Sequence, residues 1–189
     1  IAPLSPSTLA LRYYRSTLIS SLLICLAATA VCLGYLAIVG WYLSFGDVAA
    51  MVLDVILLVL FGTALSSCVI LPLSTQGQAS AVGTIVSAGY GFVCGAYMPI
   101  SSFSSGLHKV LSFLPGTYGT SLLRNHAMKG AFAEMSDSGF PQEVMTAIRD
   151  SVDCNLYFFG DKVSLGAMYL ILVGSIIGLI VLYIAIRAR

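Results

Sequence analysis

The sequence predicts an all-α polytopic membrane protein with four transmembrane helices. Of its 189 residues, 58% are hydrophobic and 9% are charged, whereas about 25% of residues are charged in an average soluble domain. Charged residues are absent from three stretches, 16–46, 55–108 and 163–186. Each stretch is longer than the ~20 apolar residues that cross a bilayer core. With a net charge of +1 and a mean hydropathy of +0.96, a soluble domain, a disordered segment and a polybasic nucleic-acid binder are all excluded.

The apolar stretches are continuous rather than alternating, which favours helices over the strands of a membrane barrel. The predicted spans are residues 17–43, 48–71, 79–98 and 163–186. Residues 44–47 are too few to do more than turn the chain, so the first two spans should form a tight hairpin. A short polar turn, residues 72–78, joins the second span to the third.

Basic residues lie at both ends of the chain. Arg12 and Arg15 precede the first span, and Arg187 and Arg189 follow the last. Loops on the cytoplasmic side of a membrane carry an excess of lysine and arginine. The sequence therefore predicts that both ends are cytoplasmic, as an even number of spans permits.

The segment 99–162 differs in composition from the rest of the chain and holds 11 of the 17 charged residues. Under the predicted topology it lies outside the cell. Apolar residues at helical spacing predict a first short helix that stops at Pro115 and Gly116. A second helix is expected over 117–129, and a third beginning at Pro141, since proline suits the first turn of a helix.

Small residues recur at four-residue spacing in three of the predicted spans, among them Gly62 and Ser66 in the second. Such a pattern lets another helix approach closely. One interpretation is ordinary helix packing; the other is a subunit interface or a surface along which helices slide. The other residues concerned are Gly83, Ser87, Gly91 and Gly95 in the third span, and Gly174 and Gly178 in the last.

Asp54 is the only charged residue inside a predicted span. An acid at mid-bilayer costs roughly 2.5–3.5 kcal/mol on insertion scales, but Asp54 lies toward the outer end of its helix. It either reaches the outer interface or lines an outward-opening cavity on the transport pathway. His108 and His126 fall on different predicted helices with no carboxylate at ligand spacing, so we expect them on the surface and expect no metal site.

No pattern for catalysis or nucleotide binding occurs in the chain. CxxC, HExxH, GxSxG and the phosphate-binding GxxxxGK[ST] are all absent. Four of the five cysteines fall in predicted spans and Cys154 lies alone outside them, so no disulfide framework is expected. We therefore expect no catalytic residues and no directly bound cofactor.

Five short motifs, taken in order, resemble the C-terminal two-thirds of a type-2 ABC exporter permease, which has six spans. They are residues 2–7 (APLSPS) before a helix, 60–67 (LFGTALSS), 95–100 (GAYMPI), 111–118 (LSFLPGTY) and 122–124 (LLR). The resemblance implies that residue 1 lies inside a longer chain. The first two spans and an amphipathic N-terminal helix of the family would then precede it.

The resemblance also implies a division of the chain. Residues 1–16 would be a cytoplasmic coupling segment, 17–100 three transmembrane helices, 101–162 an extracellular helical segment with a re-entrant helix pair, and 163–189 the last span with its cytoplasmic end. The implied contacts with the ATPase are Leu4, Ser5, Pro6 and Arg12. The implied outer gate is formed by Pro99, Pro115, Gly116 and Tyr118.

By the same resemblance, the protein would be the permease subunit of an ATP-driven exporter in a bacterial plasma membrane. It would move a small amphiphile, drug or peptide, as in multidrug efflux. The implied partners are an ABC ATPase, which holds ATP and Mg²⁺, a second permease subunit and membrane lipids, but no nucleic acid. Two other classes remain open: an intramembrane enzyme, and a channel or structural subunit that works without ATP.

Overall fold

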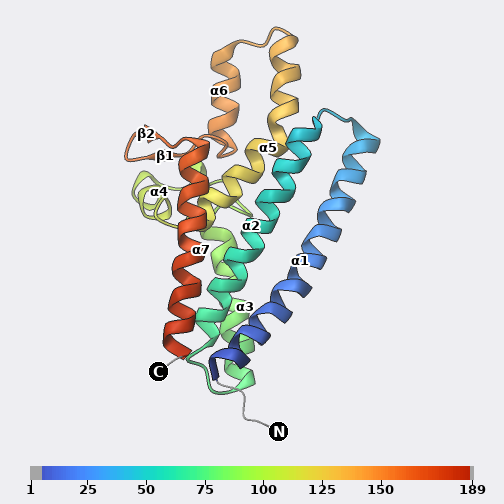
Figure 1. Ribbon diagram of the computed structural model, residues 1–189. Coiled ribbons are helices and arrows are strands. Elements are labelled where there is room, and N and C mark those ends of the chain that lie inside the picture. The colour runs from blue at the N-terminus through green and yellow to red at the C-terminus, as the bar shows by residue number, and fades with distance from the viewer. Residues whose placement is uncertain (1–5, 188–189) are drawn as a thin grey trace.

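The computed structural model describes residues 6–187 and shows a helical bundle with an outer projection (Figure 1). The described chain contains α-helices, one short 3₁₀ helix and one two-stranded antiparallel hairpin. In order these are α1 (Pro6–Val39), α2 (Phe45–Ile70), α3 (Gln76–Val93), η1 (Ile100–Ser102), α4 (Ser105–Leu111), α5 (Pro115–Asp137), α6 (Gln142–Ser151), β1 (Tyr157–Phe158), β2 (Asp161–Lys162) and α7 (Leu165–Arg187).

Three of the four predicted spans coincide with helices that are long and apolar enough to cross a membrane. These are Arg12–Val39 within α1, Phe45–Ile70 in α2 and Leu165–Ile186 within α7. The third predicted span corresponds to α3, which has 18 residues and is not among these three. The all-α membrane fold is thus confirmed, and a membrane-spanning role for α3 stays a prediction.

The hairpin between the first two spans ends in a helix cap. Ser44 and Asp47 form a capping box at the start of α2, in which each side chain bonds the backbone N–H of the other residue. This arrangement satisfies two N–H groups that the first turn would otherwise leave without partners. At the opposite end of the bundle, the Thr75 side chain accepts a hydrogen bond from the Gln78 N–H and so caps α3.

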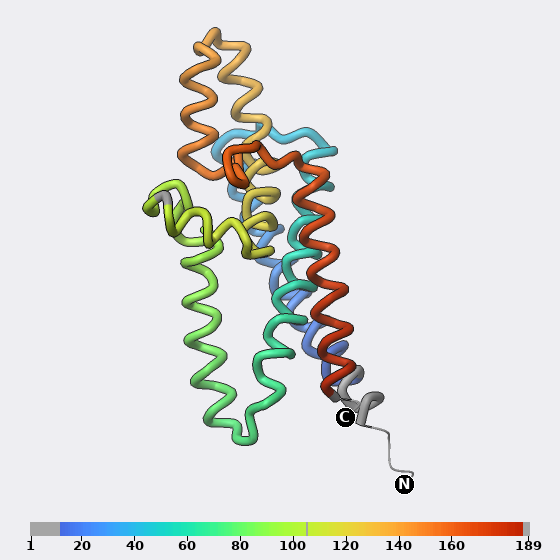
Figure 2. The backbone as a smooth tube through the Cα atoms, turned by 90° about the vertical axis from the view of Figure 1, so that its left-hand side faces the viewer, coloured from blue at the N-terminus to red at the C-terminus, as the bar shows by residue number. Residues whose placement is uncertain are grey.

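The core of the bundle lies where α2, α5 and α7 meet. Its buried apolar cluster comprises Phe61, Tyr118, Leu122, Leu156, Met168, Leu172 and Ile176. By contrast, no residue of α3 is buried. Figure 2 shows α3 running beside the bundle, apart from it over much of its length. The chain is therefore a three-helix centre with two helices, α1 and α3, at its sides.

The outer segment departs in two ways from the predicted pattern. Pro115 does not end a helical run but occupies the first position of α5, which continues to Asp137 rather than 129. The strands β1 and β2, which the sequence pattern did not predict, pair in register Tyr157 with Lys162. Pro141 precedes α6 as its N-cap residue, so the third predicted helix is confirmed. The end of α5 and α6 form a hairpin that projects from the bundle (Figure 1).

Candidate functional site

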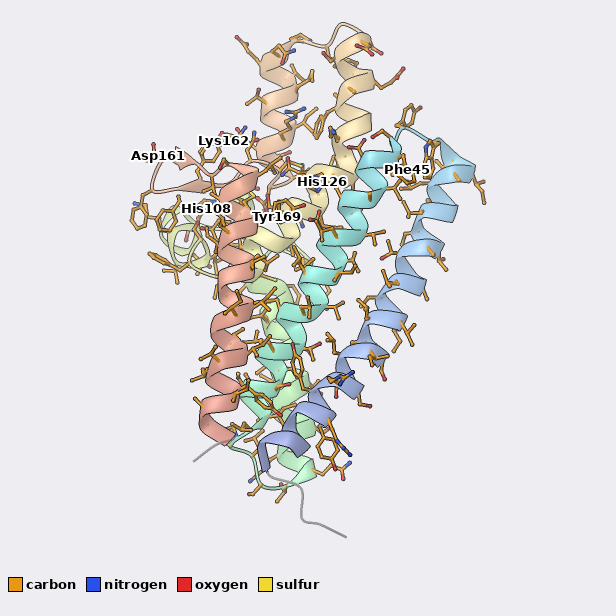
Figure 3. All side chains as sticks on the ribbon, in the orientation of Figure 1. Phe45, His108, His126, Asp161, Lys162 and Tyr169 are labelled. Atoms are coloured by element: carbon orange, nitrogen blue, oxygen red, sulfur yellow. The ribbon has the colours of Figure 1, made fainter. Side chains whose placement is uncertain are left out.

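Asp54 lies at the junction of the three central helices. Its side chain is fully buried, with 0% of its surface exposed. One carboxyl oxygen lies 2.6 Å from Nδ1 of His126 on α5, and the other accepts a hydrogen bond of 2.6 Å from the Tyr169 hydroxyl on α7. Figure 3 shows His126 and Tyr169 at the same level of the bundle. A single acidic side chain therefore joins α2, α5 and α7.

This arrangement corrects the expectation that His126 is a surface residue without a carboxylate partner. The two residues are 72 positions apart, so no local spacing could reveal the pair. The sequence does hold one signal: Asp47 and Asp54 are seven residues apart on one helix face, and His126 and Lys129 are three apart on another. Asp54 lies inside the protein and is not part of the lining of five cavities between the described residues, the α1–α2 groove among them.

A second acid–base contact lies nearer the outer end of the same two helices. The Lys129 ammonium group on α5 is 2.7 Å from an Asp47 carboxyl oxygen on α2. Asp47 is buried, whereas Lys129 is largely exposed. The two helices are antiparallel, so residues 47 and 54 of α2 meet residues 129 and 126 of α5. We call this contact the α2–α5 seam.

Two glycines allow close approach along the seam. A Cβ atom on Gly119 would overlap the Leu58 side chain on α2, at 3.2 Å from its Cγ. A Cβ atom on Gly130 would overlap the carbonyl oxygen of Tyr42, in the loop between α1 and α2. A leucine side chain can rotate away, but a backbone carbonyl cannot move without displacing its loop.

We therefore expect Gly130→Ala to destabilise the protein by about 1–3 kcal/mol, the usual cost of overpacking. The change should push the α1–α2 loop away from α5. Thermal unfolding of the purified protein in detergent measures the effect. Gly174→Ala is the matched control, since nothing lies within 4 Å of a Cβ at that position on α7, and it should not lower the unfolding temperature. Equal stability of the two variants would contradict the close approach.

The outer loops are fastened to α5 by a second charged pair. Nη1 of Arg124 lies 3.2 Å from the carboxylate of Asp153, and Nη2 donates to the carbonyl oxygen of Gly95 at the end of α3. Asp153 is only 3% exposed and also accepts hydrogen bonds from the N–H groups of Ile100 and Ser101. This contact, the Arg124 anchor, joins α5 to η1, to the end of α3 and to the loop after α6.

The predicted gate residues lie between the end of α3 and the first turn of α5. Pro99 is the N-cap residue of η1, and Pro115 begins α5. The Gly116 N–H donates to the Tyr90 hydroxyl, 3.2 Å away, and a Cβ on Gly116 would overlap the Tyr90 ring. The buried Tyr118 hydroxyl donates to the Ser112 carbonyl. These contacts fix the turn between α4 and α5 against α3, and their role as a gate stays a prediction.

The predicted contacts with an ATPase lie at the opposite end. Leu4 and Ser5 are outside the described residues, Pro6 begins α1 and Arg12 is exposed on it. The start of α1, the turn between α2 and α3, and the end of α7 gather at one end of the bundle (Figure 1). This placement is compatible with both chain ends on one side of the membrane.

The small residues of the predicted packing faces have different surroundings. A Cβ on Gly83, Gly174 or Gly178 would meet nothing within 4 Å, so these positions make no close helix contact within the described chain. Gly91 lies against the Tyr97 ring and Gly95 against Ile100. Gly83, Ser87 and Gly91 line a cavity of about 250 Å³ between α3 and α2.

A larger groove, of about 520 Å³, lies between α1 and α2. Its walls combine small or hydroxyl-bearing side chains with aliphatic ones and hold no charged group. The lining residues on α1 are Thr17, Ser21, Cys25, Ala28 and Thr29, and those on α2 are Val55, Leu58, Val59, Gly62, Thr63 and Ser66. Ligand sites are commonly apolar clefts of about 300–1,000 Å³ with a few polar groups, so this groove could hold a small amphiphilic molecule.

Among the residues that the structure describes, no group of three or more histidine, cysteine or acidic side chains could hold a metal ion. The five cysteines are free thiols. Cys154 follows Asp153 of the Arg124 anchor and is 3% exposed. Burial raises the pKa of its thiol, so it is less reactive than an exposed cysteine at neutral pH.

Comparison with known protein families shows which family the chain resembles. Residues 2–127 match the model of the family described as ABC-2 type transporter. This range includes α1 to α4 and the first half of α5, and thus both sides of the α1–α2 groove and Asp54 with His126. No curated protein and no solved structure matches the chain.

Proposed function

Because the chain belongs to the ABC-2 type transporter family, whose membrane domain is a transport subunit and not an enzyme, we propose that it exports a small amphiphilic compound, drug or peptide. Together with a second permease subunit it would form the pathway across the membrane. A partner ABC ATPase would bind ATP and Mg²⁺ and supply the energy. Closure of the ATPase would move the permease helices through the coupling segment at the start of α1.

The groove between α1 and α2 is the observation that carries the choice of substrate. Its volume of about 520 Å³ suits a drug-sized molecule. Aliphatic side chains on α2 would contact the apolar part of such a molecule, and the hydroxyl groups of Thr17, Ser21 and Thr29 could bond its polar part. A charged substrate group would find no counter-charge there, which favours neutral amphiphiles over nucleotides or sugar phosphates.

The proposed direction is export. The outer hairpin of α5 and α6 would lie outside the cell, and the start of α1 and the end of α7 would lie in the cytoplasm. The basic residues at the two ends support this orientation. The membrane would be the bacterial plasma membrane, with lipids around the exposed apolar faces of α1 and α7.

A groove-filling substitution tests the proposal. We expect Ala28→Trp, which would place an indole in the groove, to lower ATP-dependent efflux by about tenfold or more, equivalent to roughly 1.4 kcal/mol of lost substrate interaction. The measurement is uptake of a fluorescent amphiphile into inverted vesicles that contain the complete transporter with its ATPase.

Ala30→Trp is the matched control, because Ala30 is exposed on the same helix and does not line the groove. It should transport as the parent does. Equal loss in both variants would mean that the indole disturbs α1 itself, and no loss in either would place the substrate elsewhere. Uptake that does not depend on ATP in the parent would contradict the exporter proposal as a whole.

A further inference from the structure

A further cavity, of about 280 Å³, lies between α1, the end of α2 and α7. The start of α1 and the end of α7 are at this end of the bundle (Figure 1), so we call it the inner cavity. Among the residues that the structure describes, none that lines it carries a charge. Two of its lining residues, Thr17 and Ser66, also line the α1–α2 groove. The inner cavity therefore adjoins the groove in which we place the substrate.

Several hydroxyl groups of the spans bond their own helix. Thr29, Ser67 and Ser175 each donate to the carbonyl oxygen four residues earlier, as serine and threonine often do within helices. Thr17 and Ser66, on the wall that the two cavities share, have no hydrogen-bond partner within the described part of the chain. No bulk water replaces such a partner inside a membrane, so these two hydroxyl groups are free to bond a ligand.

Tyr14 adds a buried donor at the same place. Its ring borders the inner cavity and packs against Tyr183 with ring centroids 6.2 Å apart. Its hydroxyl group is buried and, among the described residues, has no hydrogen-bond partner. A buried polar group without a partner is costly. A rotation that brings the hydroxyl into the neighbouring cavity would therefore be favoured once a ligand supplies an acceptor there.

We propose that the inner cavity is the subsite for the polar end of the transported compound, and that this end is a neutral hydrogen-bond acceptor such as an amide or ester carbonyl. The Tyr14 hydroxyl donates to the acceptor oxygen, and Thr17 and Ser66 lie beside it. The apolar part of the compound lies in the α1–α2 groove against Val55 and Val59. The distance along α1 from residue 14 to residue 29 is about 22 Å at 1.5 Å per residue, so a compound up to about this length would span both cavities.

The proposal rests on the proposed transport function, but binding alone tests it. Two photoreactive aryl diazirines with the same octyl chain serve as probes. One carries an N,N-dimethylamide beside the diazirine, which accepts hydrogen bonds and donates none, and the other carries an isobutyl group in its place. Each probe is irradiated with the complete transporter and its ATPase in lipid nanodiscs without ATP. Peptide mass spectrometry then locates the adducts.

In the parent, the amide probe should label mainly residues 13–17 and 66–73, which surround the inner cavity. Tyr14→Phe removes only a hydroxyl group and should lower this labelling by about fivefold or more at a subsaturating probe concentration, as loss of one hydrogen bond would. The isobutyl probe should label both proteins equally. Tyr35→Phe is the matched control, because Tyr35 is exposed on the same helix and lines neither cavity. It should be labelled as the parent is.

Thermal unfolding without a probe gives a second readout. Tyr14→Phe should leave the unfolding temperature unchanged or raise it, since the variant loses only a buried hydroxyl group that has no partner. A lower unfolding temperature would mean that this hydroxyl group has a structural bond and would overturn its role in binding. Equal loss of labelling by both probes would do the same, because it would show a change in the shape of the cavity.

Two other outcomes would overturn the subsite. One is equal labelling of the parent and Tyr14→Phe by the amide probe, and the other is a concentration of adducts near Thr29, at the outer end of the groove. Failure of the subsite and failure of the transport proposal are distinguishable. If labelling responds as expected but no ATP-dependent efflux occurs, the transport proposal fails and the subsite stands. If Ala28→Trp lowers efflux but the amide probe labels elsewhere, transport stands and the subsite fails.

Discussion

Replacement of His126 by alanine is expected to destabilise the protein by about 3 kcal/mol, one of the two largest effects that we predict. The substitution removes one of the two partners of the Asp54 carboxyl group, which has no exposed surface. A buried polar group that loses a partner keeps its desolvation penalty, and the penalty is largest where a charge is left unpaired. Thermal or denaturant unfolding in a defined detergent or nanodisc measures the change.

Two further variants separate the polar network from simple loss of packing. Asp54→Leu combined with His126→Leu replaces both partners by apolar side chains and should recover a large part of the lost stability, since apolar substitutes for a buried pair are often tolerated. Tyr169→Phe removes only the hydroxyl group and should cost about 1–2 kcal/mol. If the double variant is less stable than His126→Ala, the contact between Asp54 and His126 stabilises the protein by more than the desolvation of its polar groups costs.

The helices of the fold are largely predictable from the sequence because each is encoded locally. Uninterrupted apolar runs mark α1, α2 and α7. The ends of α2 and α7 lie within three residues of the predicted ones, whereas α1 begins at Pro6, well before the predicted start at residue 17. The outer segment was harder to predict. Pro115 is compatible with both the end of one helix and the beginning of the next, and the neighbouring Leu114 adopts an extended conformation as the N-cap residue of α5. Pairs of two-residue strands such as β1 and β2 carry almost no periodic signal.

The site was less predictable than the fold, since its contacts join distant parts of the chain. Asp54 stood out as an acid inside an apolar helix, but its two partners lie 72 and 115 residues away. Asp153 looked like one of many acids in a polar outer segment. In the structure it is buried against Arg124 and the N–H groups of η1. Its φ angle of +55° is a left-handed conformation that aspartate tolerates better than most residues and that periodicity does not reveal. Tertiary packing decides both cases.

Replacement of Arg124 by alanine is the second substitution with a large expected effect. It would leave the Asp153 carboxylate, 3% exposed, without its cation and would remove the bond to the Gly95 carbonyl at the end of α3. Breaking one side of a buried pair typically costs about 3–5 kcal/mol; since the Arg124 side chain is 24% exposed, we expect about 2–3 kcal/mol. Arg124→Lys should recover little of the stability that Arg124→Ala loses. A single ammonium group cannot reach the separate acceptors that the guanidinium group contacts.

Cys154 provides a native reporter for the Arg124 anchor. Its thiol is buried, and burial raises its pKa, so in the parent it should react slowly with a maleimide at neutral pH and faster as the pH rises and more thiolate forms. Loosening of the anchor in Arg124→Ala should admit water and the reagent and increase the labelling rate by about tenfold or more. A decrease of about 1.4 kcal/mol in the free energy of local opening would raise the open population by that factor. Peptide mass spectrometry distinguishes Cys154 from the other cysteines.

Lys109→Ala is the control, because Lys109 is an exposed cation on α4, and Cys154 in this variant should be labelled as in the parent. Unchanged labelling in Arg124→Ala, with the protein still folded, would mean that the outer loops are held by their backbone contacts and not by the charged pair.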